Sequence, residues 1–173
     1  MPNIEIKAAY PDLEKARSIC KKLGAQFVGI DRQIDTYFCT PQGRLKLRES
    51  SLSGTYMIPY VRPDEDGPKK SDYARIQVEE PNKVKDLFSQ ILGVDQVVKK
   101  DREIYLIENV RIHLDNVDGI GPFFEFEAVY ENDSEEHRLR EEKKVEDLMK
   151  AFEISSESLQ KTSYQQLAKT SEL

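Results

Sequence analysis

The chain has 173 residues, of which 34% are charged and 38% hydrophobic, and its formal net charge is −6. This length and composition are typical of one globular domain with a buried core, so residues 1–173 are expected to form a single domain. The acidity argues against general binding to nucleic acid backbones, and no apolar stretch approaches the roughly 20 residues of a membrane-spanning helix. The first residues lack a basic region followed by an apolar run, so we expect a cytoplasmic protein.

The first part of the chain reads as strands and turns around one helix. Ile4, Ile6 and Ala8 alternate with Asn3, Glu5 and Lys7, which predicts a strand over 3–10 because successive strand side chains point to opposite faces. Apolar residues at helical spacing then predict a helix over 11–24. Further strands are expected at 26–40, 44–50 and 55–63, with turns at 41–43 and 51–54.

The second part adds strands and three more helices. The segment 64–71 is polar and rich in turn formers, and it is a candidate to close over the mouth of a tunnel, with Lys69 or Lys70 reaching phosphate. Strands are predicted at 71–80, 94–109, 110–119 and 123–131, and helices at 81–93, 133–152 and 157–169, the last capped by Ser156 or Ser158. These elements amount to about eight strands and four helices, with a helical C-terminal segment at about 134–173. Short connections favour one large antiparallel sheet.

Charged residues recur on one parity of several strands, and their signs are segregated by strand. Residues 44–48 carry three bases opposite Leu45 and Leu47, whereas Glu125 and Glu127 alternate with phenylalanines. A solvated face usually mixes signs, because like charges side by side on a strand repel. If helices cover the apolar face and the sheet closes, the charged face becomes the lumen of an inside-out barrel.

The composition of this charged face predicts the ligand. A buried excess of bases calls for a multivalent anion, and the arginine fork matches phosphate oxygens. Carboxylates near phosphate call in turn for a divalent cation such as Mg2+ or Mn2+. Asp35 and Tyr37 share one parity and are further candidates for the lumen. The candidate bases are Lys7, Arg44, Lys46, Arg48, Arg62, Lys100, Arg102 and Arg111, and the candidate acids are Glu5, Asp115, Glu125 and Glu127.

The same residues resemble a known family. NIEIKA resembles the opening Glu-x-Glu-x-Lys strand of the CYTH, or triphosphate tunnel metalloenzyme, superfamily. GRLKLRE, KKDREIY, VRIHLDNVDGIGPFFEFE and SYQQL are similar to its class IV adenylyl cyclase branch, in the expected order over nearly the whole chain. The resemblance implies an α+β, mainly β fold: a closed eight-stranded antiparallel barrel, the triphosphate tunnel, with helices packed outside. It also implies a homodimer.

The resemblance assigns roles to the lumen residues. Glu5, Glu125 and Glu127 would bind Mg2+ or Mn2+, with Asp115 near the metal. Lys7 and Asp115 are candidate general bases, and Arg102 would stabilise charge on the leaving group. Triphosphate oxygens would be held by Lys7, Lys46, Arg48, Arg62, Lys100 and Arg102, with Arg44 and Arg111 added by parity.

Three functions follow from this pattern. The first is class IV adenylyl cyclase activity, which converts ATP to cyclic AMP and pyrophosphate. The second is hydrolysis of inorganic triphosphate, thiamine triphosphate or a nucleotide. The third is a barrel that binds polyphosphate without turnover. Asn3 stands where the family pattern has its first acid, so a metal site here has one negative ligand fewer and a second metal is in doubt.

Overall fold

The computed structural model describes residues 2–62, 69–159 and 163–171, which form a mainly β arrangement with four α-helices. Its strands are β1 (Pro2–Ala9), β2 (Gln26–Phe38), β3 (Arg44–Ser50), β4 (Gly54–Val61), β5 (Lys69–Tyr73), β6 (Ile76–Gln77), β7 (Val94–Ile107), β8 (Val110–Val117) and β9 (Gly121–Val129). Its helices are α1 (Leu13–Lys22), α2 (Pro81–Leu92), α3 (Glu135–Ala151) and α4 (Tyr164–Ser171), with a 3-10 turn at Ser156–Ser158.

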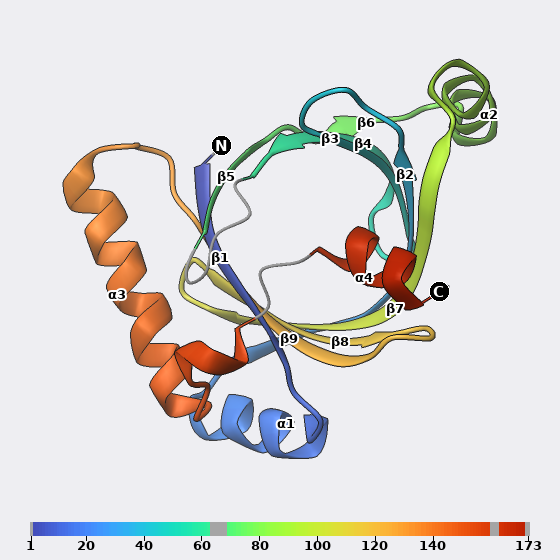
Figure 1. Ribbon diagram of the computed structural model, residues 1–173. Coiled ribbons are helices and arrows are strands. Elements are labelled where there is room, and N and C mark those ends of the chain that lie inside the picture. Colours follow the sequence, from blue (N-terminus) through green and yellow to red (C-terminus); the bar gives the residue numbers. More distant parts are fainter. Residues whose placement is uncertain (1, 63–68, 160–162, 172–173) are drawn as a thin grey trace.

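Eight of the strands pair in a closed ring. Around the ring the order is β1, β9, β8, β7, β2, β3, β4 and β5, and β5 pairs again with β1 (Figure 1). All of these pairings are antiparallel, and the two-residue β6 pairs with β4 outside the ring. The shortest strand pairing in the ring is that of β4 with β5, in which Tyr60 pairs with Tyr73 and Val61 pairs with Asp72. The prediction of a closed eight-stranded antiparallel barrel is confirmed.

The apolar parity of the strands faces outward, under helices. Ile6, Ile112 and Phe126 belong to the largest buried cluster, to which α1 contributes Cys20 and the α3 end contributes Phe152. In Figure 1, α1 and α3 lie outside the ring on the side of β1, β8 and β9. The core of this barrel is therefore between the wall and its helices, which leaves the lumen free for charged groups.

Helices α2 and α4 occupy different places. α2 lies outside the wall and packs Phe88 against Phe38 of β2. α4 lies across one end of the barrel, where Gln165 and Lys169 bond to Asp95 at the start of β7 (Figure 1). Among the described residues, no helix is both long and apolar enough to cross a membrane.

The boundaries of two predicted elements are wrong. The strand expected over 71–80 is broken at Ala74, whose N–H bonds to the Pro59 carbonyl, so it divides into β5 and β6. The last helix begins at Tyr164, because the chain at Leu159 is extended and bridges to Ala8. The predicted phosphate contacts from the 64–71 loop fall on side chains outside the described part of the chain.

The outward core supplies a first test. Ile112 is fully buried, whereas Ile91 on α2 is 75% exposed. We expect Ile112→Val to lower the free energy of unfolding by about 1 kcal/mol, because it removes a methyl group from a packed site. Ile91→Val should change it by less than about 0.5 kcal/mol. Urea titration of both variants measures the difference, and equal values would place the core elsewhere.

Candidate functional site: a charged cavity inside the barrel

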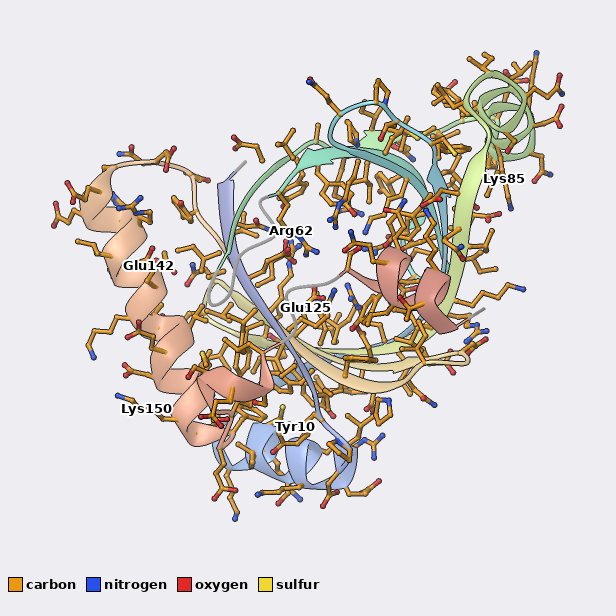
Figure 2. The ribbon with its side chains drawn as sticks, viewed as in Figure 1. Tyr10, Arg62, Lys85, Glu125, Glu142 and Lys150 are labelled. Atoms are coloured by element: carbon orange, nitrogen blue, oxygen red, sulfur yellow. The ribbon has the colours of Figure 1, made fainter. Side chains whose placement is uncertain are left out.

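The barrel encloses a cavity of about 380 Å3. The alternation of each strand turns its charged parity inward, so side chains far apart in sequence meet there (Figure 2 labels Arg62 and Glu125 inside the ring). Lining residues from the predicted set are Glu5, Lys7, Lys46, Arg48, Arg62, Arg102, Arg111, Glu125 and Glu127.

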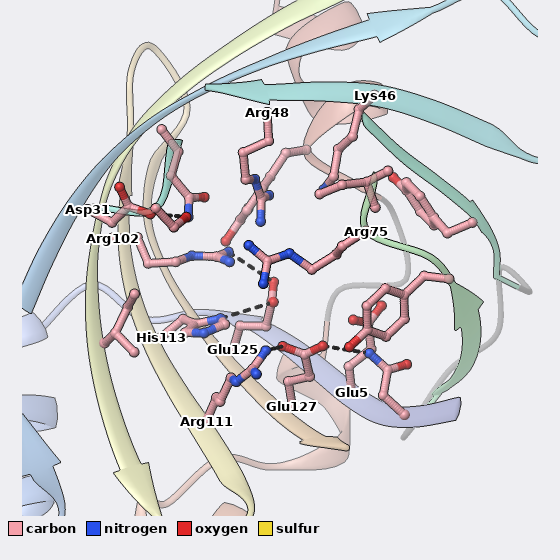
Figure 3. Close-up of a pocket in the computed structure, with 18 of the residues that line it drawn as sticks. Glu5, Asp31, Lys46, Arg48, Arg75, Arg102, Arg111, His113, Glu125 and Glu127 are labelled. Carbon is pink, nitrogen blue, oxygen red and sulfur yellow. Dashed lines mark hydrogen bonds and ion pairs between the residues drawn. The ribbon is translucent and has the colours of Figure 1, made fainter. Parts of the chain in front are cut away.

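The outer half of the cavity, defined here by Asn3, Glu5, Arg111 and Glu127, holds two facing carboxylates. Glu5 and Glu127 are direct partners across β1 and β9. Glu5 accepts a hydrogen bond from Arg62, and Glu127 lies 3.7 Å from Arg111 (Figure 3). Asn3 Nδ2 donates to Glu127 Oε1 at 2.8 Å, whereas no described residue bonds to the buried Asn3 Oδ1. An unsatisfied buried oxygen beside two carboxylates is costly unless a ligand completes it.

Glu125 stands in the middle of the cavity. It faces Lys7 across β1 and His113 across β8, and its oxygens lie 3.3 Å from His113 Nδ1 and 3.6 Å from Arg102. Burial would raise the pKa of Glu125, but the charge on Arg102 and the bond from His113 outweigh it and hold the pKa well below its usual value. The carboxylate is therefore ionised at neutral pH.

The inner half of the cavity, defined here by Asp35, Lys46, Arg48, Lys100, Arg102 and Asp115, contains two buried ion-pair centres. Asp35 accepts two 2.7 Å bonds from Arg48 and one of 3.1 Å from Lys100, and it lies 3.6 Å from Lys46. Asp115 accepts two 2.7 Å bonds from Arg102. Four cations thus face two carboxylates. Lys7 and Glu125, which face each other nearby, leave this surplus unchanged.

Burial lowers the pKa values of three lysines in the cavity. Burial and the charge on Arg48 lower the pKa of Lys46 to about 7. Burial lowers the pKa values of Lys7 and Lys100 to about 8, although Glu125 and Asp35 respectively act against it. The cations around Asp35 outweigh its burial and hold its pKa well below the usual value. A bound anion would favour the charged form of these buried lysines and raise their pKa values.

The structure places the other predicted residues behind the lining. Lys100 and Asp115 are fully buried beneath the cavity surface, and Arg44 lies beside Tyr60. Asp35 is also fully buried, and Tyr37 lines the cavity. Every predicted lumen residue except Arg44 thus belongs to the cavity lining or to the ion pairs under it, while their individual roles stay predictions.

Sequence reasoning missed several lining residues, among them Arg75, Asp31 and Tyr164. Arg75 follows the break after β5 and stacks on Tyr56, 4.1 Å from the ring centroid, with its guanidinium inside the cavity (Figure 3). Asp31 accepts bonds from Gln33 and from the β3–β4 turn. Tyr164 reaches in from α4 and donates to Asp115 Oδ2 at 2.7 Å. The only available signals were the inward parity of Asp31 and the SYQQL motif.

The carboxylates of the outer half and the middle of the cavity, together with Asn3, fit a divalent cation by their chemistry. Glu5, Glu125, Glu127 and Asn3 offer only oxygen donors, which suit Mg2+ or Mn2+. Within the described residues no three such side chains are already grouped around one point, because their oxygens are bound to arginine, histidine and asparagine donors. Asn3 Oδ1, which no described residue satisfies, would offer such a cation a neutral oxygen ligand.

Comparisons with known proteins agree with this geometry. The chain is 29% identical over 175 residues to a protein of Methanocaldococcus jannaschii named as a candidate adenylate cyclase, covering 96% of this chain and 98% of that one. It resembles a solved Pyrococcus horikoshii protein with 26% identity and a TM-score of 0.81, over 95% of this chain and 98% of the other. A Hippeastrum candidate adenylyl cyclase, described as having a dominant triphosphatase activity, shares the fold with 16% identity and a TM-score of 0.62, over 99% and 97% of the two chains.

The family model of the CYTH domain matches residues 1–164, which include all the strands and every lining residue of the cavity. The chain belongs to the CYTH domain family.

Proposed function

We propose that this chain binds the triphosphate of ATP in the barrel and converts ATP to cyclic AMP and pyrophosphate with the help of Mg2+ or Mn2+. The observation that carries the proposal is the buried surplus of cations in the inner half, where Arg48, Lys46 and Arg102 line the cavity. Burying so many like charges is unfavourable unless a multivalent anion neutralises them. The relative named as a candidate adenylate cyclase supports the same substrate.

The order of charges along the cavity favours reaction at the α-phosphorus. Cations without enough acids lie in the inner half, whereas Glu5 and Glu127 lie in the outer half beside Asn3. A triphosphate bound with its free end inward therefore has its ester phosphorus beside the carboxylates. The ribose 3′-oxygen would form the new bond to that phosphorus, and pyrophosphate would leave into the cationic inner half.

The residues have separable tasks in this reaction. Arg48 and Arg102 would hold the pyrophosphate oxygens and stabilise their growing charge. Lys7 is the better candidate for taking the 3′-hydroxyl proton, because burial lowers its pKa to about 8 and part of it is neutral at neutral pH. Asp115 is a poorer base, since Arg102 and Tyr164 occupy both of its oxygens.

Glu5, Glu125 and Glu127 would hold the divalent cation, with Asn3 Oδ1 as a neutral ligand. When bound, such a cation neutralises phosphate charge and lowers the pKa of a nearby hydroxyl. The three glutamates carry the negative charge of this site, and Asn3 orients Glu127 through its 2.8 Å bond.

Hydrolysis is the second candidate function, and one observation favours it. The outer mouth of the cavity is open, since Val28 and Leu52 line the cavity and are 50% and 54% exposed. Water can therefore reach a bound phosphate from that side. For a triphosphate bound with its free end toward the mouth, this water would attack the terminal phosphorus and break its bond to the next phosphate. Orthophosphate would then leave from tripolyphosphate, thiamine triphosphate or a nucleotide.

The experiment that tests the proposal is product analysis. Purified protein is incubated with Mn2+ or Mg2+ and, separately, with ATP, tripolyphosphate and thiamine triphosphate, and products are resolved by chromatography. We expect cyclic AMP and pyrophosphate from ATP, lost in Glu127→Gln and retained in Glu108→Gln, whose side chain is 72% exposed on the β7–β8 turn. Orthophosphate without cyclic AMP would replace the cyclase by a triphosphatase. Binding without any product would leave only a polyphosphate-binding barrel.

A further inference from the structure

The mouth of the cavity has an apolar side in addition to its charged outer half. We call this side the apolar wall and define it by four lining residues of β2, β7 and the β3–β4 turn: Val28, Leu52, Ile104 and Leu106. Val28 and Leu52 are about half exposed, and the other two are half-buried. Phosphate groups have no apolar surface to place here. The wall therefore indicates that the ligand carries an organic group as well.

The apolar wall is assembled around Gly29. This residue follows Val28 on β2 and pairs with Ile104 of β7. A Cβ atom at Gly29 would lie 3.4 Å from Leu52 Cδ1, so the Leu52 side chain lies against bare backbone. The N–H of Leu52 donates to Asp31 Oδ1 at 3.3 Å, which ties the β3–β4 turn to β2. The result is a fixed apolar surface beside a buried carboxylate.

Asp31 also orients Gln33, which lines the cavity and is only 4% exposed (Figure 3 labels Asp31). Gln33 Nε2 donates to Asp31 Oδ2 at 2.7 Å. Burial would raise the pKa of Asp31, but hydrogen bonds from Gln33 and Ser50 outweigh it and hold the pKa below its usual value. An ionised carboxylate only accepts hydrogen bonds, so the amide nitrogen of Gln33 must face it and the amide oxygen is turned away.

The oxygen of Gln33 is a buried acceptor that lacks a partner. No described residue bonds to Gln33 Oε1. Leaving such an atom unpaired is costly, so a ligand that donates to it gains affinity. Ionised phosphate oxygens are acceptors and cannot fill this role. The donor must belong to the organic part of the ligand, and the apolar wall next to Gln33 suits a flat ring that carries an N–H group.

We propose that the apolar wall and Gln33 Oε1 form a subsite for a flat heterocycle with an amino group, which makes this chain select ATP over nucleotides with a keto group in its place. The inference rests on the proposed triphosphate site and adds the recognition of the base. The ring covers the wall, and its amino N–H donates to Oε1. A keto oxygen at that position would place two acceptors against each other.

Calorimetric binding in EDTA, which prevents metal-dependent turnover, tests the proposal. The probes are ATP, inosine triphosphate, in which a keto oxygen replaces the amino group, and tripolyphosphate. We expect ATP to bind at least about tenfold more tightly than inosine triphosphate. Inosine triphosphate binding as tightly as ATP would overturn the base subsite while leaving the triphosphate site intact, and so would binding of tripolyphosphate alone. If none of the three binds, the proposed triphosphate site itself fails.

A matched pair of variants assigns the selectivity to Gln33. Gln33→Met keeps the length of the side chain but removes the acceptor, so the preference for ATP over inosine triphosphate should fall below about threefold. Gln90→Met is the control, since Gln90 lies exposed on α2 and bonds to Asp86, and it should keep the full preference. An unchanged preference in Gln33→Met that melts like the parent chain would remove Gln33 from the proposal. If that variant does not fold, the comparison of ATP with inosine triphosphate on the unmodified chain still decides.

A second pair of variants tests the apolar wall. Leu52→Ala should weaken ATP binding by about fivefold and leave tripolyphosphate binding unchanged, because only ATP has a ring to cover the wall. Leu139→Ala on α3 replaces a leucine of similar exposure, 53% against 54%, and should change neither affinity. Unchanged ATP binding in Leu52→Ala, or an equal loss for both ligands, would show that the wall does not hold the base.

Discussion

Asp35→Asn is expected to lower the free energy of unfolding at neutral pH by about 3 kcal/mol. Asp35 is fully buried and is the acceptor for Arg48 and Lys100, with Lys46 3.6 Å away. Asn keeps the shape but removes the charge, so buried cations lose their counter-ion, and breaking one side of a buried pair costs about 3–5 kcal/mol. Lys46 and Lys100 can lose their protons when Asp35 is neutralised, because their pKa values are about 7 and about 8. The loss of stability should therefore lie in the lower part of this range. Denaturant titration measures it.

Asp101→Asn is the matched control on the outer surface of the barrel wall. Asp101 is 52% exposed and lies 3.3 Å from Arg32, so its loss should cost less than about 1 kcal/mol. Tripolyphosphate should restore part of the lost stability of Asp35→Asn, because it supplies the missing negative charge. A loss no greater than that of Asp101→Asn would mean that the inner half does not depend on Asp35 for charge balance.

The pH dependence of this contribution has a definite sign. The pKa of Asp35 is held well below its usual value in the folded chain, mainly because the attraction of Arg48, Lys100 and Lys46 exceeds the effect of burial. A carboxyl with a depressed folded pKa stabilises the fold above its unfolded pKa and loses that effect as pH falls through the folded value. The stability difference between the parent chain and Asp35→Asn should therefore shrink in acid.

The strands and the inward charged face were predictable because they depend on local alternation. Glu5, Arg48 and Glu127 are each flanked by apolar residues, and this parity fixes which face they share. Closure was not predictable in the same way. The pairing of β4 with β5 brings together Val61 and Asp72, which are not neighbours in the sequence, and no local pattern predicts such a contact.

The residues missed by sequence reasoning are those that enter the cavity by tertiary geometry alone. The sequence of the helix that contains Tyr164 does not indicate a position inside the cavity. Only the placement of α4 across the barrel end brings Tyr164 to Asp115. Arg75 lies between β5 and β6, outside both strands. Strand alternation therefore does not predict the direction of its side chain. Asp35 was a candidate by parity, but its ion pairs with three cations depend on β3 and β7 lying on either side of β2.

Replacing Lys46 should weaken tripolyphosphate binding without lowering the free energy of unfolding. Lys46 lines the cavity with a side chain 14% exposed, near the rings of Tyr37 and Tyr60, and Asp35 is already bound by Arg48. Lys46→Met should weaken tripolyphosphate binding by about tenfold to a hundredfold, because a charged hydrogen bond is worth about 1.5–3 kcal/mol. The same variant should not lose stability, since it removes one of the surplus buried cations. Calorimetry and denaturant titration give the two values.

The pH dependence of binding distinguishes Lys46 from its neighbours. Burial and Arg48 lower the pKa of Lys46 to about 7, whereas the pKa values of Lys7 and Lys100 are about 8. A bound triphosphate favours the charged lysine and raises its pKa, so affinity should fall by up to about tenfold per unit as pH rises above 7. Lys46→Arg stays charged over this range. Its affinity should therefore decrease less than that of the parent chain between pH 7 and 8.

Because both proteins meet the same ligand, titration of the phosphate itself cancels in this comparison. Identical pH profiles of affinity for the parent chain and Lys46→Arg would show that Lys46 keeps its proton throughout. The cavity would then hold more negative charge around Lys46 than Asp35 alone provides. A difference confined to that window would instead show that Lys46 takes up a proton when the triphosphate binds, because the effect requires a group whose pKa lies near that window and rises on binding.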